Sequence, residues 1–202
     1  NTFLETVSPE LPPVSSDYKG TWLSLYRETL EKRATFLADV PFSDMAAYKA
    51  ILERAPTPYH IQISNSAPIR YAQLFPAKAG WQVFCNRGTS GIDGSTSTAI
   101  GASVVQATPT LLITGDLSFF YNSNALWCNY IPKNLKIIVV NNAGGGIFRI
   151  LPTDKGTPFF ETFQETTHSL TAKHLCAMYG FTYLCAQNQE ELTKTLETFF
   201  SQ

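Results

Sequence analysis

The chain has 202 residues with a formal net charge of −1, and 44% of its residues are hydrophobic against 15% charged. This length suffices for one sizeable domain with its own core, and the low share of charge suggests that another domain or subunit covers part of the surface. The near-neutral balance excludes the basic footprint of a nucleic-acid-binding or anionic-membrane-binding protein, and no apolar run approaches the ~18 residues of a membrane span.

The N-terminal part predicts a linker followed by helices. Residues 1–17 place Pro9, Pro12 and Pro13 among Ser and Thr, which is typical of an irregular lead-in or the end of an interdomain linker. The domain itself is expected over residues 18–202. Apolar residues recur at helical spacing over residues 22–30, and a second helix is expected over residues 43–54 with Ser43 as its N-cap.

Short β-branched segments alternate with helical ones in the remainder of the chain. Strands are expected over residues 60–63, 81–85, 110–114, 135–140 and 181–184. Helices are expected over residues 95–106, 118–129, 170–179 and 190–200. This alternation predicts an α/β fold, with a parallel sheet covered by helices on both faces.

Polar loops follow three of the expected strands. They span residues 86–94, 115–118 and 141–146, and they are rich in Gly, Asn, Asp and Ser. Ligands of parallel sheets bind beyond the carboxyl ends of the strands, where all three loops would open on one edge. We therefore expect the functional site there.

The cysteines and histidines give no sign of a metal or catalytic role. None of the four cysteines forms a CxxC pair, which argues against a zinc site. Three of them lie in apolar runs, which indicates reduced core thiols and a cytoplasmic location. His60, His168 and His174 have no partner that the sequence identifies, so we assign them structural positions.

Two of the polar loops suit a diphosphate and a divalent metal. GDLS at residues 115–118 opens an expected helix, and NNAGGG at residues 141–146 ends the next strand. A helix N-terminus offers free N–H groups and a positive dipole end to phosphate. Asp116 would repel a phosphate unless a cation lay between them, and Asn142 adds a neutral oxygen of the kind Mg²⁺ prefers. Either loop alone is compatible with an ordinary turn, whereas the two together favour a metal site.

The two loops resemble the signature of thiamine-diphosphate enzymes, a GDG followed at this distance by NN. The resemblance implies the diphosphate-binding domain of that class. It also implies a Mg²⁺ or Mn²⁺ ion held by Asp116, the Asn142 side chain and the Gly144 carbonyl. Leu117 replaces the last Gly of the general signature, and Leu is usual at this place in SEPHCHC synthases of menaquinone biosynthesis.

Three further stretches resemble the SEPHCHC synthase family: NSAPIR at residues 65–70, NRGTSGIDG at 86–94 and GGGIF at 144–148. With the metal motif, the resemblance covers about residues 59–152 well. It implies contacts to thiamine diphosphate by Ser90, Gly91, Ile92, Gly115, Asp116, Leu117, Ser118, Asn142, Gly144 and Ile147. Ile92 would be the apolar wedge that holds the two cofactor rings in their bent form.

The family's substrates, 2-oxoglutarate and isochorismate, each carry two carboxylates, which guanidinium groups grip bidentately. The resemblance implies catalytic roles for Ser66, Arg70, Arg87 and Ile92. It implies substrate contacts by Ser66, Arg70, Arg87, Ile147, Phe148 and Leu151. Ordinary alternatives stay open here: surface ion pairs for the arginines, a plain turn for the glycines and a core position for Ile92.

The resemblance also implies parts that this chain lacks. In thiamine-diphosphate enzymes, a Glu from a separate pyrimidine-binding domain activates the cofactor, and this chain has strands for one sheet. We expect a C-terminal fragment, inactive alone, of a homodimeric or tetrameric enzyme that decarboxylates 2-oxoglutarate and adds the succinyl carbanion to isochorismate. The alternatives are another thiamine-diphosphate-dependent 2-oxo-acid decarboxylase and a non-catalytic module that keeps the cofactor fold.

Overall fold

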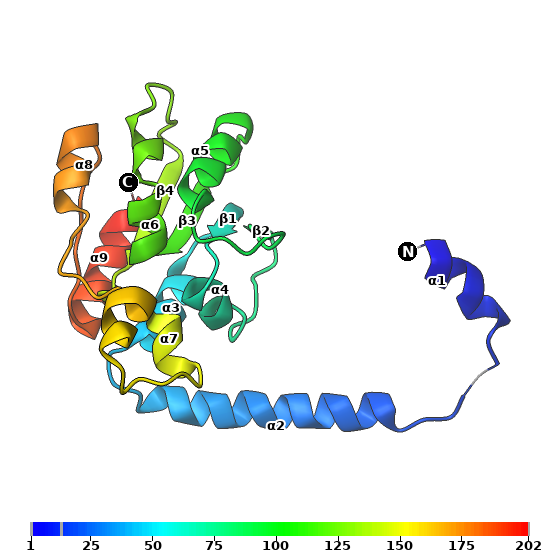
Figure 1. Cartoon of the computed structure of the whole chain (residues 1–202). Coiled ribbons are helices and arrows are strands. Elements are labelled where there is room, and N and C mark those ends of the chain that lie inside the picture. The colour runs from blue at the N-terminus through cyan, green and yellow to red at the C-terminus, as the bar shows by residue number, and fades with distance from the viewer. Residues whose placement is uncertain (1, 13, 202) are drawn as a thin grey trace. The chain divides into compact units, whose positions relative to one another are not determined.

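The computed structural model describes residues 2–12 and 14–201 of the chain. These fall into two compact units, Asn1–Pro41 and Phe42–Gln202. The first unit contains helix α1 (Thr2–Val7), the 3₁₀ turn η1 (Ser8–Glu10) and the long helix α2 (Tyr18–Ala38) (Figure 1). The helical spacing over residues 22–30 is confirmed, because it lies within α2.

The irregular lead-in expected over residues 1–17 is wrong for α1 and η1. Pro9 occupies one of the first two positions of η1. A proline is tolerated there because the N–H that it lacks has no partner in the first turn of a helix. The proline-rich composition therefore did not prevent helical turns.

The second unit is built on four parallel strands, β1 (Tyr59–Ile63), β2 (Trp81–Cys85), β3 (Thr110–Gly115) and β4 (Leu135–Val140), in the order β2-β1-β3-β4. In the register, His60 lies opposite Gln82 on one side and Thr110 on the other. The four strands expected up to residue 140 are thus confirmed, and their carboxyl ends meet at one edge.

The fifth expected strand, over residues 181–184, is wrong, because this segment forms no strand in the described sheet. Phe181 and Tyr183 instead pack against an apolar cluster that covers one face of the sheet. Their alternation with Thr182 and Leu184 therefore reflects packing onto the core, without a backbone ladder to β4.

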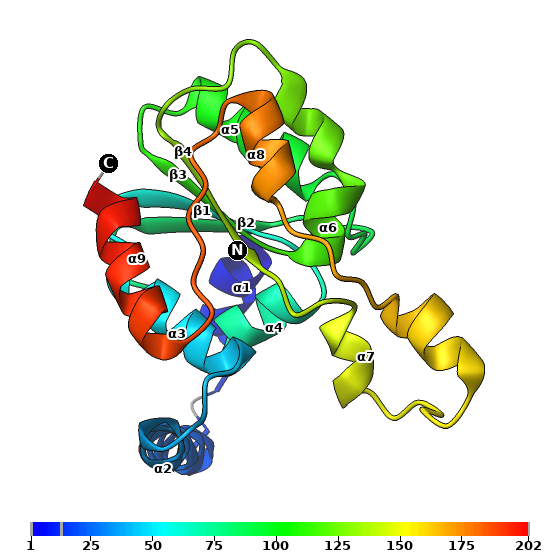
Figure 2. The same cartoon turned by 90° about the vertical axis from the view of Figure 1, so that its left-hand side faces the viewer.

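Helices cover both faces of the sheet (Figure 2). On one face, α3 (Asp44–Arg54), α4 (Ala67–Ala72) and α9 (Gln189–Ser201) pack with β1 and β3 around Ile61, Leu111 and Ile113. On the other face, α5 (Ser95–Val105), α6 (Asp116–Tyr121), the 3₁₀ turn η2 (Ser123–Trp127) and α8 (Lys173–Tyr179) surround Leu112. Successive β3 side chains thus enter opposite layers, as the period of two in a strand requires. The predicted α/β class is confirmed.

The helices differ from expectation mainly near the carboxyl edge. The helix expected over residues 118–129 begins at Asp116 and is divided at Asn122, whose Oδ1 accepts hydrogen bonds from the backbone N and the Oγ of Ser97 on α5. The short elements α4, α7 (Gly146–Ile150) and the π-helical turn η3 (Phe160–Glu165) were not expected. Ser43 is the predicted N-cap of α3, and its side chain accepts from Ala46 N.

The four cysteines are free thiols. Cys85, Cys128 and Cys176 are half-buried and Cys185 is exposed. Cys176 packs against the apolar cluster around Leu112, as expected for a core thiol. None of the described helices is both long enough and apolar enough to span a membrane.

Candidate functional site

A cavity of about 320 Å³ opens at the carboxyl edge of the sheet. Its lining includes all the sequence-predicted site residues except Gly91: Ser66, Arg70, Arg87, Ser90, Ile92, Gly115, Asp116, Leu117, Ser118, Asn142, Gly144, Ile147, Phe148 and Leu151. Gly91 instead accepts a hydrogen bond at its carbonyl from Asn65 Nδ2, at 2.7 Å. The structure thus brings the predicted residues together, while their roles toward a ligand stay predictions.

Asp116 lies at the start of α6 and is only 2% exposed. Its Oδ1 accepts from the backbone N–H of Leu117 at 2.7 Å, and its Oδ2 accepts from the backbone N–H of Gly144 at 3.0 Å. The second bond joins the loop after β3 to the loop after β4. The carboxylate is therefore fixed in place where the two predicted metal-binding loops meet.

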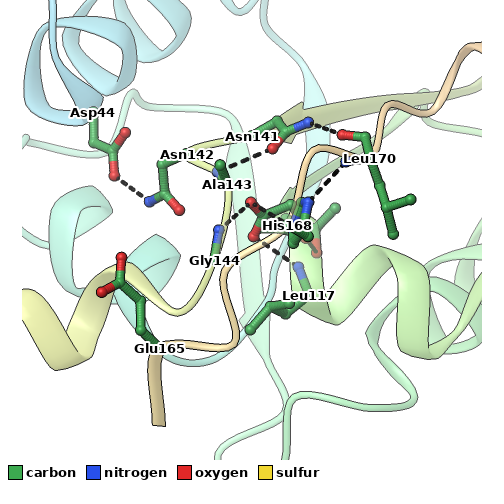
Figure 3. Close-up of polar contacts among 12 residues, drawn as sticks. Asp44, Leu117, Asn141, Asn142, Ala143, Gly144, Glu165, His168 and Leu170 are labelled. Carbon is green, nitrogen blue, oxygen red and sulfur yellow. Dashed lines mark hydrogen bonds and ion pairs between the residues drawn. The ribbon is translucent and has the colours of Figure 1, made fainter. Parts of the chain in front are cut away.

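The Asn142 side chain presents an unpartnered oxygen at the same place. Its Nδ2 donates to Asp44 Oδ2 at 2.7 Å (Figure 3). Its Oδ1 is buried and has no hydrogen-bond partner among the described residues. An unsatisfied buried acceptor costs about 1–3 kcal/mol, so such an atom in a site usually indicates a missing ligand or ion.

The loop after β4 depends on glycine geometry. Gly144 has φ of +152°, and a Cβ at this position would lie 2.8 Å from the backbone oxygen of Glu165. The Gly144 carbonyl accepts from Gly146 N at 2.9 Å, and Gly145 N donates to Glu165 O at 2.5 Å. Glu165 in turn pairs with Arg149, with 2.5 Å between Nη2 and Oε1. The turn η3 therefore holds the glycine loop against the cavity.

The oxygens gathered here fit a hard divalent cation. They are the Asp116 carboxylate, the unpartnered amide oxygen of Asn142 and the Gly144 carbonyl, which has a second lone pair. Oxygen ligands of this kind, completed by diphosphate oxygens and water, suit Mg²⁺. Across residues 2–12 and 14–201, no group of three His, Cys, Asp or Glu side chains could hold a metal ion. A metal at this site therefore depends on neutral oxygens beside one carboxylate.

Asn65 fixes the loop over residues 86–94. The residue follows β1, is 1% exposed, and donates from Nδ2 to the carbonyls of Asn86 and Gly91. Its Oδ1 accepts from Arg87 Nη1 at 3.2 Å. Its motif was recognised in the sequence, but no role was assigned to Asn65 itself. Cys85 Sγ also donates to Oδ1, at 3.4 Å. These contacts show that Asn65 positions Arg87 and the loop that carries Ile92.

Arg70 and Arg87 place two positive charges at the cavity. Both side chains are exposed, and their guanidinium groups donate to neutral oxygens, Arg70 Nη1 to Ser66 O at 2.9 Å and Arg87 to Asn65. Neither forms an ion pair with an acidic side chain in the described parts of the chain. The described residues thus supply no acidic partner for an ordinary surface ion pair, and within this part of the chain both charges remain available to an anion.

Helix α3 contributes two lining residues that the sequence analysis missed, Asp44 and Tyr48. Tyr48 is 1% exposed, stacks on Tyr71 with 5.4 Å between ring centroids, and has a hydroxyl without a hydrogen-bond partner among the described residues. Burial raises the pKa of Tyr48 well above its usual value, and Asp44, Tyr71 and Asp116 raise it further. Tyr48 is therefore a neutral donor at working pH. Asp44 and Tyr48 are four residues apart, which places them on one face of a helix, and this spacing was the sequence signal that could have identified them.

His168 does have a partner, contrary to the sequence analysis. Its Nε2 lies 3.3 Å from Asp116 Oδ2. Its Nδ1 accepts from the backbone N–H of Leu170 at 3.1 Å (Figure 3). Nε2 has no hydrogen-bond partner among the described residues, so its contact with Asp116 is one of proximity alone. His168 lies in a loop distant in sequence from Asp116, and no sequence pattern indicated the contact.

The fold and the cavity define a cofactor-binding α/β domain, and the comparisons identify its family. The family model of the thiamine pyrophosphate enzyme C-terminal TPP binding domain matches residues 66–202, and the chain belongs to this family. Thiamine pyrophosphate is thiamine diphosphate, so the predicted cofactor class and the diphosphate-binding fold are confirmed.

Three similar curated proteins carry the same name. The chain is 51% identical over 197 residues to 2-succinyl-5-enolpyruvyl-6-hydroxy-3-cyclohexene-1-carboxylate synthase of Flavobacterium psychrophilum, covering 98% of this chain and 36% of that protein. It is 47% identical over 201 residues to the synthase of the same name from Flavobacterium johnsoniae, covering 100% of this chain and 36% of that protein. It is 42% identical over 200 residues to the synthase of the same name from Porphyromonas gingivalis, covering 98% of this chain and 35% of that protein.

The resemblance to SEPHCHC synthases, the short name for these proteins, is therefore confirmed. It extends over nearly the whole chain, well beyond residues 59–152 where the motifs are concentrated. The chain spans about a third of the length of these relatives, 35% to 36%.

Proposed function

We propose that this chain forms the diphosphate- and metal-binding part of a SEPHCHC synthase, a thiamine-diphosphate-dependent enzyme of menaquinone biosynthesis. The observation that carries the proposal is one cavity that Asp116 and Asn142 both line, together with the family motifs, where Asp116 is bonded to Gly144 N and the Asn142 amide oxygen has no partner among the described residues. The similarity to enzymes of that name over nearly the whole chain supports it.

In this proposal Asp116, Asn142 Oδ1 and the Gly144 carbonyl hold Mg²⁺, or Mn²⁺ in its place. The Ser90–Ile92 segment and the start of α6 flank the diphosphate, and Ile92, half-buried at the cavity wall, supports the cofactor rings. Thiamine diphosphate, when bound, supplies the electron sink that decarboxylation of a 2-oxo acid needs. The protein's own contribution is to orient the cofactor and to exclude water from it.

Arg70 and Arg87 are the proposed carboxylate anchors for 2-oxoglutarate and isochorismate, with Ser66 beside them. Both guanidinium groups reach the cavity without an acidic partner in the described chain, which suits dianionic substrates. Ile147, Phe148 and Leu151 form an apolar wall of the same cavity. Such a wall lowers the local polarity, which favours loss of a carboxylate as uncharged CO₂.

The proposal includes a pyrimidine-binding domain, with its activating Glu, that this chain does not supply. The relatives are about three times as long as the chain, which leaves room for such a domain. A homodimer or homotetramer with the site between subunits, in the cytoplasm, completes the proposal. The low share of charged residues, 15%, is in keeping with surfaces that are covered in such an assembly.

The test is turnover by the natural protein that carries this sequence. Supplied with thiamine diphosphate, Mg²⁺, 2-oxoglutarate and isochorismate, it should release CO₂ and form the succinyl adduct, both measured by mass spectrometry. Equal turnover of pyruvate would favour another 2-oxo-acid decarboxylase. Cofactor binding without turnover of either 2-oxo acid would indicate a non-catalytic module.

A further inference from the structure

We propose that Asp44 is a positioning residue that orients the Asn142 amide, so that the amide oxygen and not its nitrogen faces the metal site. Asp44 opens helix α3, outside the residues 66–202 that the family model matches. The inference rests on the proposed metal site at Asp116, Asn142 and Gly144. It adds Asp44, which would turn the oxygen of the Asn142 amide toward the metal.

The chemistry of the contact fixes the orientation. A carboxylate accepts hydrogen bonds but cannot donate them, whereas an amide has a donor end and an acceptor end of nearly equal size. The contact of 2.7 Å between Asn142 Nδ2 and Asp44 Oδ2 therefore forms in one orientation of the amide. The reverse orientation would place two oxygens against each other at that distance.

The consequence is visible at the other end of the amide. With Nδ2 bound to Asp44, Oδ1 is left buried and unpartnered among the described residues, in a residue that lines the same cavity as Asp116. Without Asp44, nothing in the contacts of the described residues would stop the amide from turning its NH₂ group toward a cation. Asp44 thus selects the ligand oxygen in advance of metal binding.

Asp44 is itself held firmly enough to do this. Ser43 caps α3 by accepting from Ala46 N, and Tyr48 and Ile51, further along the same helix, are each 1% exposed. Figure 3 shows the Asp44 carboxylate at the start of its helix, directed at the Asn142 amide nitrogen. A rigid helix therefore carries the orienting group to the loop after β4, 98 residues away in sequence.

The first test measures Mn²⁺ affinity by electron paramagnetic resonance, in the natural protein with saturating thiamine diphosphate. Asp44→Ala should weaken Mn²⁺ binding about 10- to 100-fold, the usual effect of removing a residue that orients a metal ligand. Asp44→Asn should fall between it and the wild type, because an Asn can still offer an oxygen to Asn142 without enforcing it. Unchanged affinity in Asp44→Ala would overturn the inference.

A matched control separates orientation from charge. Glu53 is an acidic residue of the same helix, paired with Lys49 and absent from the cavity lining. Glu53→Ala makes the same change in net charge as Asp44→Ala, and it should leave Mn²⁺ affinity at the wild-type value. A loss equal to that of Asp44→Ala would show a general charge effect and would overturn the positioning role.

The second test uses Asn142→Asp, whose two oxygens are equivalent, so there is no orientation to set. In that background Asp44 faces a like charge, and Asp44→Ala should leave Mn²⁺ affinity unchanged or raise it. An equal loss in both backgrounds would mean that Asp44 acts only through its charge. If Asn142→Ala does not weaken Mn²⁺ binding, the proposed metal site itself fails. If Asn142→Ala weakens Mn²⁺ binding but Asp44→Ala has no effect on it, only the positioning inference fails.

Discussion

Gly144→Ala should loosen the glycine loop at the centre of the proposed site. Gly144 has φ of +152°, where an L side chain is strained, and its new Cβ would lie 2.8 Å from the Glu165 backbone oxygen. Backbone strain of this kind costs about 1–3 kcal/mol, and crowding of a packed position costs a similar ~1–3 kcal/mol. The reduced entropy of the unfolded chain offsets about 0.4–1 kcal/mol. A net loss of roughly 1–6 kcal/mol in the free energy of unfolding follows.

Urea denaturation of the natural protein, without cofactor, measures this loss, and metal affinity is measured in parallel. Gly101→Ala is the matched control, because a Cβ on Gly101 in α5 would have nothing within 4 Å. It should stabilise the protein by up to about 1 kcal/mol, as expected for Gly to Ala inside a helix. Gly144→Ala should also weaken Mg²⁺ binding, since the Gly144 carbonyl must shift with the loop. A Gly144→Ala variant as stable as the control, with normal Mg²⁺ affinity, would refute the close contact with Glu165.

Three further changes test other parts of the account. Arg87→Ala should raise the KM for 2-oxoglutarate by an amount equivalent to about 2–5 kcal/mol, with little change in cofactor affinity; a collapse of cofactor affinity alone would assign Arg87 to the diphosphate. Asn65→Ala should increase hydrogen exchange of the amides over residues 86–94, which Asn65 ties to β1; unaltered protection would contradict that role. Burial lowers the pKa of His60, so its stabilising effect is full above the unfolded pKa of about 6.5 and is lost as pH falls through the folded value. His60→Gln should therefore flatten the acid-side decline in the free energy of unfolding, and an unchanged pH slope would show that His60 does not titrate there.

Much of the site could be predicted because it follows from the geometry of parallel sheets. Asp116 and Asn142 each come directly after a strand, and β3 and β4 are adjacent, so their loops had to meet. The strand from Leu135 to Val140 was equally clear, as a continuous β-branched run. Local sequence was therefore enough to predict a contact wherever the pairing of the strands brings the two residues together.

Contacts that depend on how separate segments dock could not be predicted in the same way. Asp44 and His168 reach the proposed metal-binding loops from a helix and a loop whose positions are set by core packing. The division of the helix at Asn122 has the same origin, because it depends on a contact with Ser97 on α5. Residues 181–184 alternate like a strand, but their aromatic side chains are used in core packing.

The most direct test of the central claim is calorimetric titration of the natural protein with thiamine diphosphate, with and without Mg²⁺, for the wild type and for Asp116→Ala. Asp116 is the one carboxylate in the proposed metal shell. Its loss removes a helix-end contact worth about 1 kcal/mol and leaves the Gly144 N–H without its acceptor, at a cost of about 1–3 kcal/mol. A domain's free energy of unfolding is ~5–15 kcal/mol, so the fold should survive. Circular dichroism of the variant should match the wild type, and its Mg²⁺-dependent cofactor binding should be absent. Tight binding in the variant, with the same dependence on Mg²⁺ as in the wild type, would contradict the claim that Asp116 and Asn142 form the metal site of this domain.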